Sequence, residues 1–247
     1  YRQPGLQVHV IRILWMVPVY AVESFLSLFF TEYALFFETI RDSFEAFVIY
    51  SFLQLLLNYV GSEARLSDRL RHKPSSVGRH LPPCSWCLRE WRLGRDFVQR
   101  CKEGVLQYVV IKLLCTAAVV ALELNGKYAE GSLQPDRGYL YVTLLSNFSQ
   151  IWAIYALVMF YQATKEELAG IKPFPKFTVI KAVVFFSWWQ SVAISIAAEM
   201  GYIRGGQGYS RLEVAKALQN LLICVEMLVA AVAHRSIFNV KEFMDST

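Results

Sequence analysis

The chain has 247 residues, of which 55% are hydrophobic and only 18% are charged, and its formal net charge is +5. A soluble globular protein carries about 25% charged residues and rarely contains an apolar run of the roughly 20 residues that cross a bilayer. The composition therefore excludes soluble, disordered, collagen-like, coiled-coil and disulfide-stapled proteins, and it predicts an all-α polytopic membrane protein.

Six hydrophobic segments are long enough to span a membrane as helices. In chain order they cover residues 7–30, 38–60, 104–123, 138–162, 176–199 and 211–238. The connections are short except for 61–103, so we expect one transmembrane helical domain over residues 1–247. Because the chain begins at Tyr1 with no leader before the first apolar run, we also expect an upstream segment, which makes six a minimum.

Lysine and arginine residues concentrate in two connections, which sets the expected orientation of the spans. The segment 61–103 contains ten of them, and the short connection after the fourth hydrophobic segment is also basic. The remaining connections, 31–38, 125–137 and 201–209, are acidic or nearly balanced in charge. We therefore expect the two basic connections and both ends of the chain in the cytoplasm. This bias accounts for the net positive charge, and we expect no nucleic-acid partner.

The basic connection contains a stretch with helical periodicity at about residues 85–103. At 100° per residue, Cys87, Trp91 and Cys101 fall on one face, and most of the arginines fall on the opposite face. An apolar and aromatic face set against an arginine-rich face is typical of a helix that lies in the headgroup region. We therefore expect a cytoplasmic interfacial amphipathic helix here, and a helix packed under the bundle is the alternative.

Three of the five cysteines, Cys84, Cys87 and Cys101, lie in this cytoplasmic connection, where disulfides are rare. Juxtamembrane cysteines are typical sites of S-acylation, so we predict lipidation at these three positions. A zinc site made of the three thiols and His80 is the alternative, although one C-x-x-C without a second pair is a weak zinc signal. We assign the other two cysteines to helix packing, and we expect no metal and no other cofactor.

Several polar side chains fall inside the hydrophobic segments, where each needs a partner or a water-filled cavity. Arg41 and Glu45 are four residues apart and share a helix face. Glu23 and Asn147 lie at a similar distance from the outer ends of their own segments. These four residues predict one outward polar cluster.

Two charged residues lie deeper in their segments. At 1.5 Å per residue, Lys112 is about 12 Å and Glu226 about 16 Å from the inner ends, so we predict a buried ion pair between them. Glu226, Gln190 and the outward cluster are our candidates for the polar lining of a substrate-binding site. The alternative is that these groups only hold the helices together.

Motifs of known enzyme classes are not found in the sequence. There is no Walker loop, dinucleotide fingerprint, H-E-x-x-H motif or G-x-S-x-G elbow. An intramembrane hydrolase would need a nucleophile with a base, or paired metal ligands, and the four histidines give this little support. We therefore expect no enzymatic activity.

Five stretches of the chain resemble one family, in the expected order. They cover residues 12–20 (RILWMVPVY), 41–52 (RDSFEAFVIYSF), 104–108 (GVLQY), 172–190 (KPFPKF running into KAVVFFSWWQ) and 222–234 (LICVEMLVAAVAH). Together they resemble the organic solute transporter alpha subunit family, with its transmembrane-protein-184 and plant LAZARUS branches. The match extends over nearly the whole chain and is closest to the transmembrane-protein-184 branch.

The resemblance implies a seven-helix bundle with its N-terminus outside and its C-terminus inside, of which this chain would hold the last six helices. It also implies a palmitoylated cytoplasmic loop, which corresponds here to Cys84 and Cys87. Better-known members of the family move bile acids, steroid conjugates and similar amphiphiles down their gradients, together with a small single-span beta subunit. The expected partners are therefore membrane lipids, an amphipathic small molecule, and a beta-type subunit or a second copy.

We therefore expect a facilitative carrier of amphipathic organic solutes or lipids in the plasma membrane or in an endomembrane such as that of the vacuole or endosome. A seven-span receptor or scaffold in signalling or membrane traffic is the alternative, in which the basic loop would dock partners or anionic lipid. Net flux in liposomes would favour the carrier. Recruitment of a cytosolic partner without flux would favour the receptor.

Overall fold

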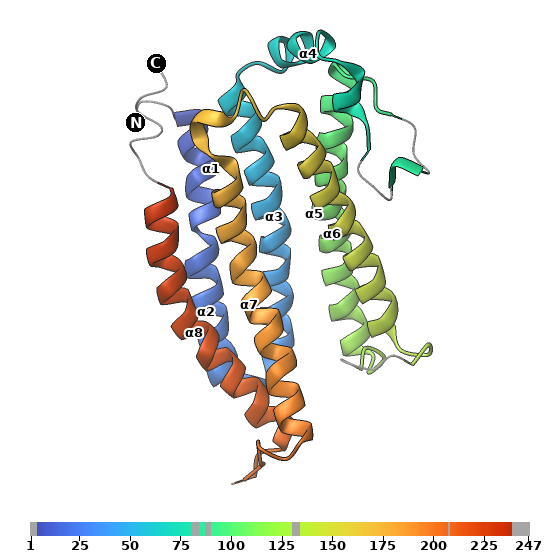
Figure 1. Ribbon diagram of the computed structural model, residues 1–247. Helices are drawn as coiled ribbons and strands as arrows, with labels where there is room; N and C mark the ends of the chain where they lie inside the picture. The colour runs from blue at the N-terminus through green and yellow to red at the C-terminus, as the bar shows by residue number, and fades with distance from the viewer. Residues whose placement is uncertain (1–3, 81–83, 87–89, 130–133, 207, 239–247) are drawn as a thin grey trace. The chain divides into compact units, whose positions relative to one another are not determined.

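The computed structural model describes residues 4–80, 84–86, 90–129, 134–206 and 208–238. Within these ranges the regular structure is helical, apart from one isolated bridge between Gly206 and Tyr209 (Figure 1). Six helical segments are long and apolar enough to cross a membrane, as the six hydrophobic segments predict. The all-α fold class is confirmed.

The spans begin and end close to the predicted segments. The first span, Pro4–Phe29, consists of α1 (Pro4–Leu14) and α2 (Met16–Phe29). The break between them lies one turn before Pro18, which has no N–H to donate to the carbonyl of Leu14 and whose ring crowds that carbonyl. The other spans contain α3 (Ala34–Val60), α5 (Arg95–Leu124), α6 (Gly138–Ala163), α7 (Pro173–Glu199) and α8 (Arg211–Ile237).

The chain divides into two compact units. Unit 1 comprises Tyr1–His9 and Glu45–Ile171, and unit 2 comprises Val10–Phe44 and Lys172–Thr247. The division falls inside α3, so the first part of this helix belongs to unit 2 and the remainder to unit 1.

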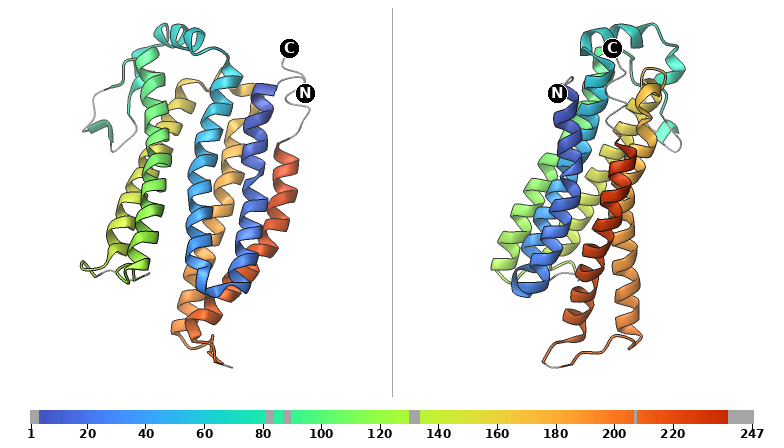
Figure 2. Two further views of the ribbon diagram at one scale, coloured as in Figure 1. Left: turned by 180° about the vertical axis from the view of Figure 1, so that it is seen from behind. Right: turned by 90° about the vertical axis from the view of Figure 1, so that its left-hand side faces the viewer.

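In unit 1, α5 and α6 pack side by side as an antiparallel pair (Figures 1 and 2). Their close approach depends on glycine. A Cβ atom on Gly104 would lie 2.7 Å from the Cβ of Ala156, and a Cβ on Gly138 would collide with Leu122. Small residues at these contacts let the two helix backbones approach closely, which is the usual way in which membrane helices gain packing energy.

In unit 2, α8 packs against both α2 and α7 (Figure 2). The helix starts at a capping box, in which Ser210 accepts from the N–H of Glu213 and the Glu213 carboxylate accepts from the N–H of Ser210. The residues of its buried stripe recur every three or four positions: Asn220, Ile223, Met227, Ala230 and His234. This spacing aligns them along one face of the helix.

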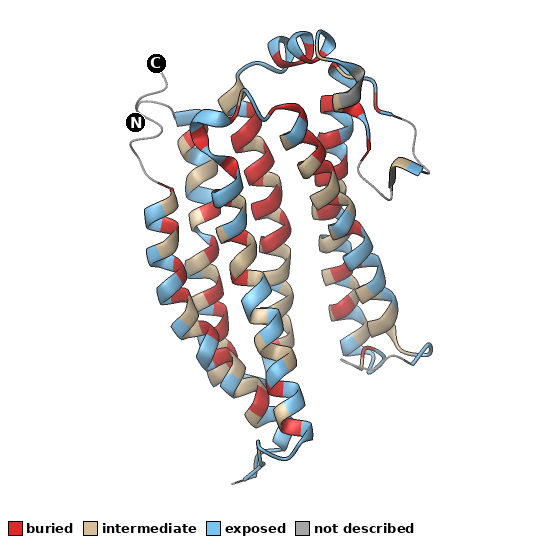
Figure 3. Cartoon of the chain, in the orientation of Figure 1, coloured by how far each residue is buried: buried red, intermediate tan, exposed pale blue. Residues whose placement is uncertain are grey.

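Large apolar side chains are exposed over much of the spans (Figure 3). On α7 only 17% of the most apolar window is buried, and four consecutive or near-consecutive aromatic residues are exposed: Phe185, Phe186, Trp188 and Trp189. By contrast, 56% of the corresponding window around α3 is buried. Apolar side chains exposed in this way are stable against lipid tails, which agrees with a multi-pass membrane protein.

The structure corrects the expectation of a separate amphipathic helix at residues 85–103. Residues 95–103 are the first turns of α5, which continues without a break into the span. The short helix of this connection is instead α4 (Glu63–Arg71), whose Leu66 and Leu70 are buried. Helical periodicity alone does not show where a helix starts. Here Gly94, at a φ of +123° that favours glycine, marks the start of α5.

Candidate functional site

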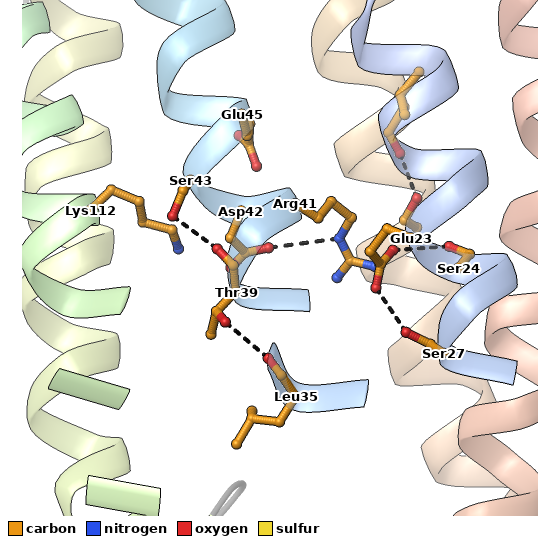
Figure 4. Close-up of polar contacts among 12 residues, drawn as sticks. Glu23, Ser24, Ser27, Leu35, Thr39, Arg41, Asp42, Ser43, Glu45 and Lys112 are labelled. Carbon is orange, nitrogen blue, oxygen red and sulfur yellow. Dashed lines mark hydrogen bonds and ion pairs between the residues drawn. The ribbon is translucent and has the colours of Figure 1, made fainter. Parts of the chain in front are cut away.

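A buried carboxylate on α2 is the centre of the polar contacts in unit 2 (Figure 4). The Glu23 side chain is only 5% exposed and accepts hydrogen bonds from the hydroxyls of Ser24 at 3.1 Å and Ser27 at 3.2 Å. Arg41 Nη1 lies 3.1 Å from Glu23 Oε2 and completes an ion pair between α2 and α3. The carboxylate therefore has hydrogen-bond partners for both of its oxygens.

Arg41 has further contacts of its own. Its Nε lies 3.8 Å from a carboxylate oxygen of Asp42, and its guanidinium carbon lies 5.5 Å from the centre of the Tyr20 ring. The side chain is 17% exposed, and Tyr20 is buried. At 1.5 Å per residue, Glu23 lies about 9 Å from the end of α2 and Arg41 about 10 Å from the start of α3. Two of the four residues of the predicted outward cluster are thus brought together.

Glu45 belongs to unit 1 and has a different partner. Its side chain is 6% exposed and accepts a hydrogen bond from Gln150 Nε2 on α6 at 3.1 Å. Asn147, the α6 residue that the sequence suggested, is exposed. The neighbour of Glu45 is therefore Gln150, one helical turn further along α6.

Polar contacts continue along the α5–α6 pair. Gln107 donates to the carbonyl of Ser149 at 2.9 Å, and the hydroxyl of Ser149 donates back to Gln107 at 2.8 Å. Lys112 donates to the hydroxyl of Ser146 at 3.3 Å. Sequence reasoning missed Ser146, Ser149 and Gln107. The spacing of Ser146, Ser149 and Gln150, which places them on one helix face, is the signal that could have identified the α6 residues.

The two remaining candidates lie in unit 2. Gln190 on α7 donates to the backbone carbonyl of Gln219 on α8 at 3.4 Å. Glu226 lies near the middle of α8 and is partly buried. Because Lys112 belongs to unit 1 and Glu226 to unit 2, the ion pair between them stays a prediction.

The three predicted lipidation sites have different outcomes. Cys84 is the first residue of a short 3-10 helix, Cys84–Trp86, and Cys87 lies outside the described residues. The thiol of Cys101 is fully buried in α5. An acyl chain cannot be attached to a thiol without access to solvent or lipid, so this conformation does not support Cys101 as a site.

The comparison with family models identifies the chain. The model of the organic solute transporter Ostalpha family matches residues 1–243. The chain belongs to this family. The resemblance found in the sequence is therefore confirmed. The family is one of transporters of organic solutes.

A plant protein is among the relatives of this family member. Protein LAZ1 homolog 1 of Arabidopsis thaliana is 37% identical over 252 residues, which covers 96% of the chain and 51% of the relative. The chain thus spans about half the length of this curated relative. No solved structure matches the chain.

Proposed function

We propose that this protein is a facilitative transporter of amphipathic organic solutes or lipids, with bile-acid-like or steroid-like anions among the solutes. Membership of a solute transporter family supports the general activity. The observation that carries the proposal is the buried ion pair of Glu23 and Arg41, which lies well inside two apolar spans.

The physical argument rests on the cost of burying charge. An ionisable side chain at membrane depth is expensive, and a pair of apolar residues often stabilises a helix contact as well as a buried ion pair does. A carboxylate with three side-chain donors at this depth therefore supports a role beyond packing, and the role that we propose is handling of the polar head of a solute.

The chemistry of the pair suits an anionic or hydroxylated head. The guanidinium of Arg41 presents planar N–H donors that match a carboxylate, sulfate or phosphate. Such a group could replace the Glu23 carboxylate as the partner of Arg41 and could accept hydrogen bonds from Ser24 and Ser27. The proposed polar lining comprises Glu23, Arg41, Glu45, Asn147, Gln190 and Glu226, with Lys112 as the counter-ion of Glu226. The apolar body of the solute would lie against aromatic side chains of the spans.

Flux of a labelled steroid sulfate into proteoliposomes tests the proposal. We expect Arg41→Gln to lower the rate about tenfold or more, because it removes a charge-assisted hydrogen bond to the sulfate. Glu45→Gln and Glu226→Gln should lower the rate of a steroid sulfate that also carries hydroxyl groups, because each removes a charged acceptor for those hydroxyls. Glu199→Gln is the matched control, since Glu199 is 80% exposed and its only described ion pair is with Arg211 at 3.8 Å. Normal flux in all three variants, with normal folded yield, would exclude this lining.

The same measurement separates the carrier from the receptor or scaffold. A folded protein that gives no flux with any amphiphile, yet recruits a cytosolic partner when an amphiphile is added, would be a receptor. Flux that appears only on co-expression with a single-span subunit would establish a beta-type partner. Plasma membrane and endomembrane remain the two proposed locations.

A further inference from the structure

The long basic connection of unit 1 carries a group of exposed arginines, which we call the arginine face. It comprises residues of α4, of the segment before α5 and of the first two turns of α5: Arg65, Arg69, Arg71, Arg92, Arg95 and Arg100. All six side chains are exposed. On α4, the buried Leu66 and Leu70 occupy the opposite side of the helix, which leaves Arg65 and Arg69 together on the outer side.

This connection is fixed to the spans by several contacts. Ser62 caps α4 by accepting from the N–H of Arg65, and Lys102 on α5 lies 2.6 Å from Glu63 Oε1. Lys73 donates to the carbonyl of Ala163 at 2.9 Å, where α6 ends. A cation at the C-terminus of a helix satisfies an unpaired carbonyl and interacts favourably with the helix dipole. The arginines are therefore presented from a folded support.

Close packing brings arginines of two helices together. A Cβ on Gly94 would lie 3.0 Å from Cγ of Arg71, so the Arg71 side chain lies directly over the turn that starts α5. Arg95 is the next residue. The guanidinium carbon of Arg100 lies 5.9 Å from the centre of the Trp91 ring, a cation–π contact typical of side chains at a membrane surface.

The arginine face is not neutralised by close ion pairs, although the exposed Asp68 and Asp96 are the sequence neighbours of Arg69 and Arg95. Among the described residues, no carboxylate lies within ion-pair distance of any of its six arginines, whereas Lys73, Arg79 and Lys102 in the same connection all have acidic partners. Clustered like charges repel one another. An external anion would remove that repulsion.

The position of the arginine face along α5 indicates what kind of anion would bind there. The apolar part of this span begins at Gly104, so at 1.5 Å per residue Arg100 lies about 6 Å and Arg95 about 14 Å beyond it. The headgroup layer of a bilayer is about 5–7 Å deep on each side. Arg100 thus lies at the level of the lipid phosphates, while Arg95 lies beyond it. A headgroup that carries phosphates at both heights would contact both side chains.

We propose that the arginine face binds the headgroup of an anionic lipid with more than one phosphate, such as a phosphorylated phosphatidylinositol, in the leaflet next to α4. The lipid phosphate contacts Arg100, and the ring phosphates contact Arg71, Arg92 and Arg95. The tail of the lipid lies along the exposed apolar surface of α5. This site is separate from the polar lining proposed for transport, and neither proposal depends on the other.

Native mass spectrometry of the intact protein in mild detergent tests the site. The protein is titrated with short-chain phosphatidylinositol bisphosphate, with short-chain phosphatidylserine and with free inositol trisphosphate. We expect the bisphosphate lipid to bind most tightly. Each arginine near an anionic headgroup contributes about fivefold in affinity, so Arg71→Gln with Arg95→Gln should weaken binding about 25-fold.

Two controls accompany the double variant. Arg204→Gln removes an exposed arginine outside the arginine face and should leave the affinity unchanged. Arg71→Lys with Arg95→Lys keeps the charge and should bind within about threefold of the unchanged protein. Equal binding of phosphatidylserine and the bisphosphate lipid, or an unchanged affinity in the glutamine variant, would overturn the proposal. Equally tight binding of free inositol trisphosphate would also overturn it, in favour of a soluble anion.

Discussion

At the scale of single residues, the buried charges behave as a group and not as separate side chains. Glu23 accepts from Ser24, Ser27 and Arg41, so the loss of any one donor changes the environment of the same carboxylate. Removal of one partner of a buried ion pair leaves a charge without compensation, and replacement of both partners by apolar residues does not. Comparison of the single variant with the double apolar variant therefore distinguishes a structural role of the pair from a role in transport.

The first prediction concerns this pair. Arg41→Met should lower the free energy of unfolding by about 3 kcal/mol, because Glu23 then stays buried without its guanidinium. Glu23→Leu with Arg41→Met should recover most of that loss and still abolish steroid-sulfate flux. Thermal unfolding in detergent and proteoliposome flux are the two measurements. A double variant that transports normally would show that the pair serves packing alone.

The second prediction concerns lipidation. We expect Cys84→Ser with Cys87→Ser to remove the thioester-linked acyl groups, and Cys101→Ser to keep them, because the Cys101 thiol is buried. Mass tagging of hydroxylamine-released thiols counts the acyl groups on each variant. Loss of an acyl group from Cys101→Ser would mean that α5 opens during acylation.

At the scale of helices, the α5–α6 pair shows how membrane helices associate. Lipid tails are as apolar as leucine, so burial of leucine side chains between two helices gains little over their exposure to lipid. Close contact between backbones is the main gain, and it requires small residues. Gly104 against Ala156 provides this contact at one end of the pair, and Gly138 against Leu122 provides it at the other.

The third prediction concerns this contact. Gly104→Leu should separate α5 from α6 and destabilise the protein by about 2 kcal/mol or more, because a Cβ alone would lie 2.7 Å from Ala156 Cβ. Gly5→Ala is the matched control in another helix. A Cβ there has no atom within 4 Å, so this change should be neutral or stabilise α1 by up to about 1 kcal/mol. Equal thermal stability of Gly104→Leu and the unchanged protein would contradict this packing.

At the scale of the whole molecule, the distribution of basic residues predicts how the spans cross the bilayer. Alternating spans place the connection with α4 and the connection before α7 on one side, and residues 125–137 and 201–209 on the other. The positive-inside rule assigns the first side to the cytoplasm.

The fourth prediction tests this orientation. In a cysteine-free background, Arg69→Cys and Arg204→Cys both introduce a thiol at an exposed position. A membrane-impermeant maleimide should label Arg69→Cys only from the cytoplasmic side and Arg204→Cys only from the opposite side. Labelling of both from one side would show that the number of spans between them is even.

Much of the fold could be predicted from the sequence because bilayer thickness imposes a length on every span. Six apolar segments of suitable length became six helical spans, and five ordered stretches indicated a family that the family model confirmed. The start of α5 was less predictable. A continuous helical periodicity ran through Gly94, and only the backbone of the folded chain, with a φ of +123° at this glycine, shows where the helix begins.

The sequence by itself determined the all-α class, the six spans and the family, since each depends on composition, segment length or motif order. Only the tertiary structure decided which polar side chains meet. Asn147 is exposed, while Gln150 contacts Glu45, although both lie in the same charge-free segment. In a membrane protein the lipid-facing and protein-facing sides of a helix are both apolar, so hydrophobic periodicity does not distinguish inside from outside. The packing of one helix against another shows which side faces the protein and which side faces the lipid.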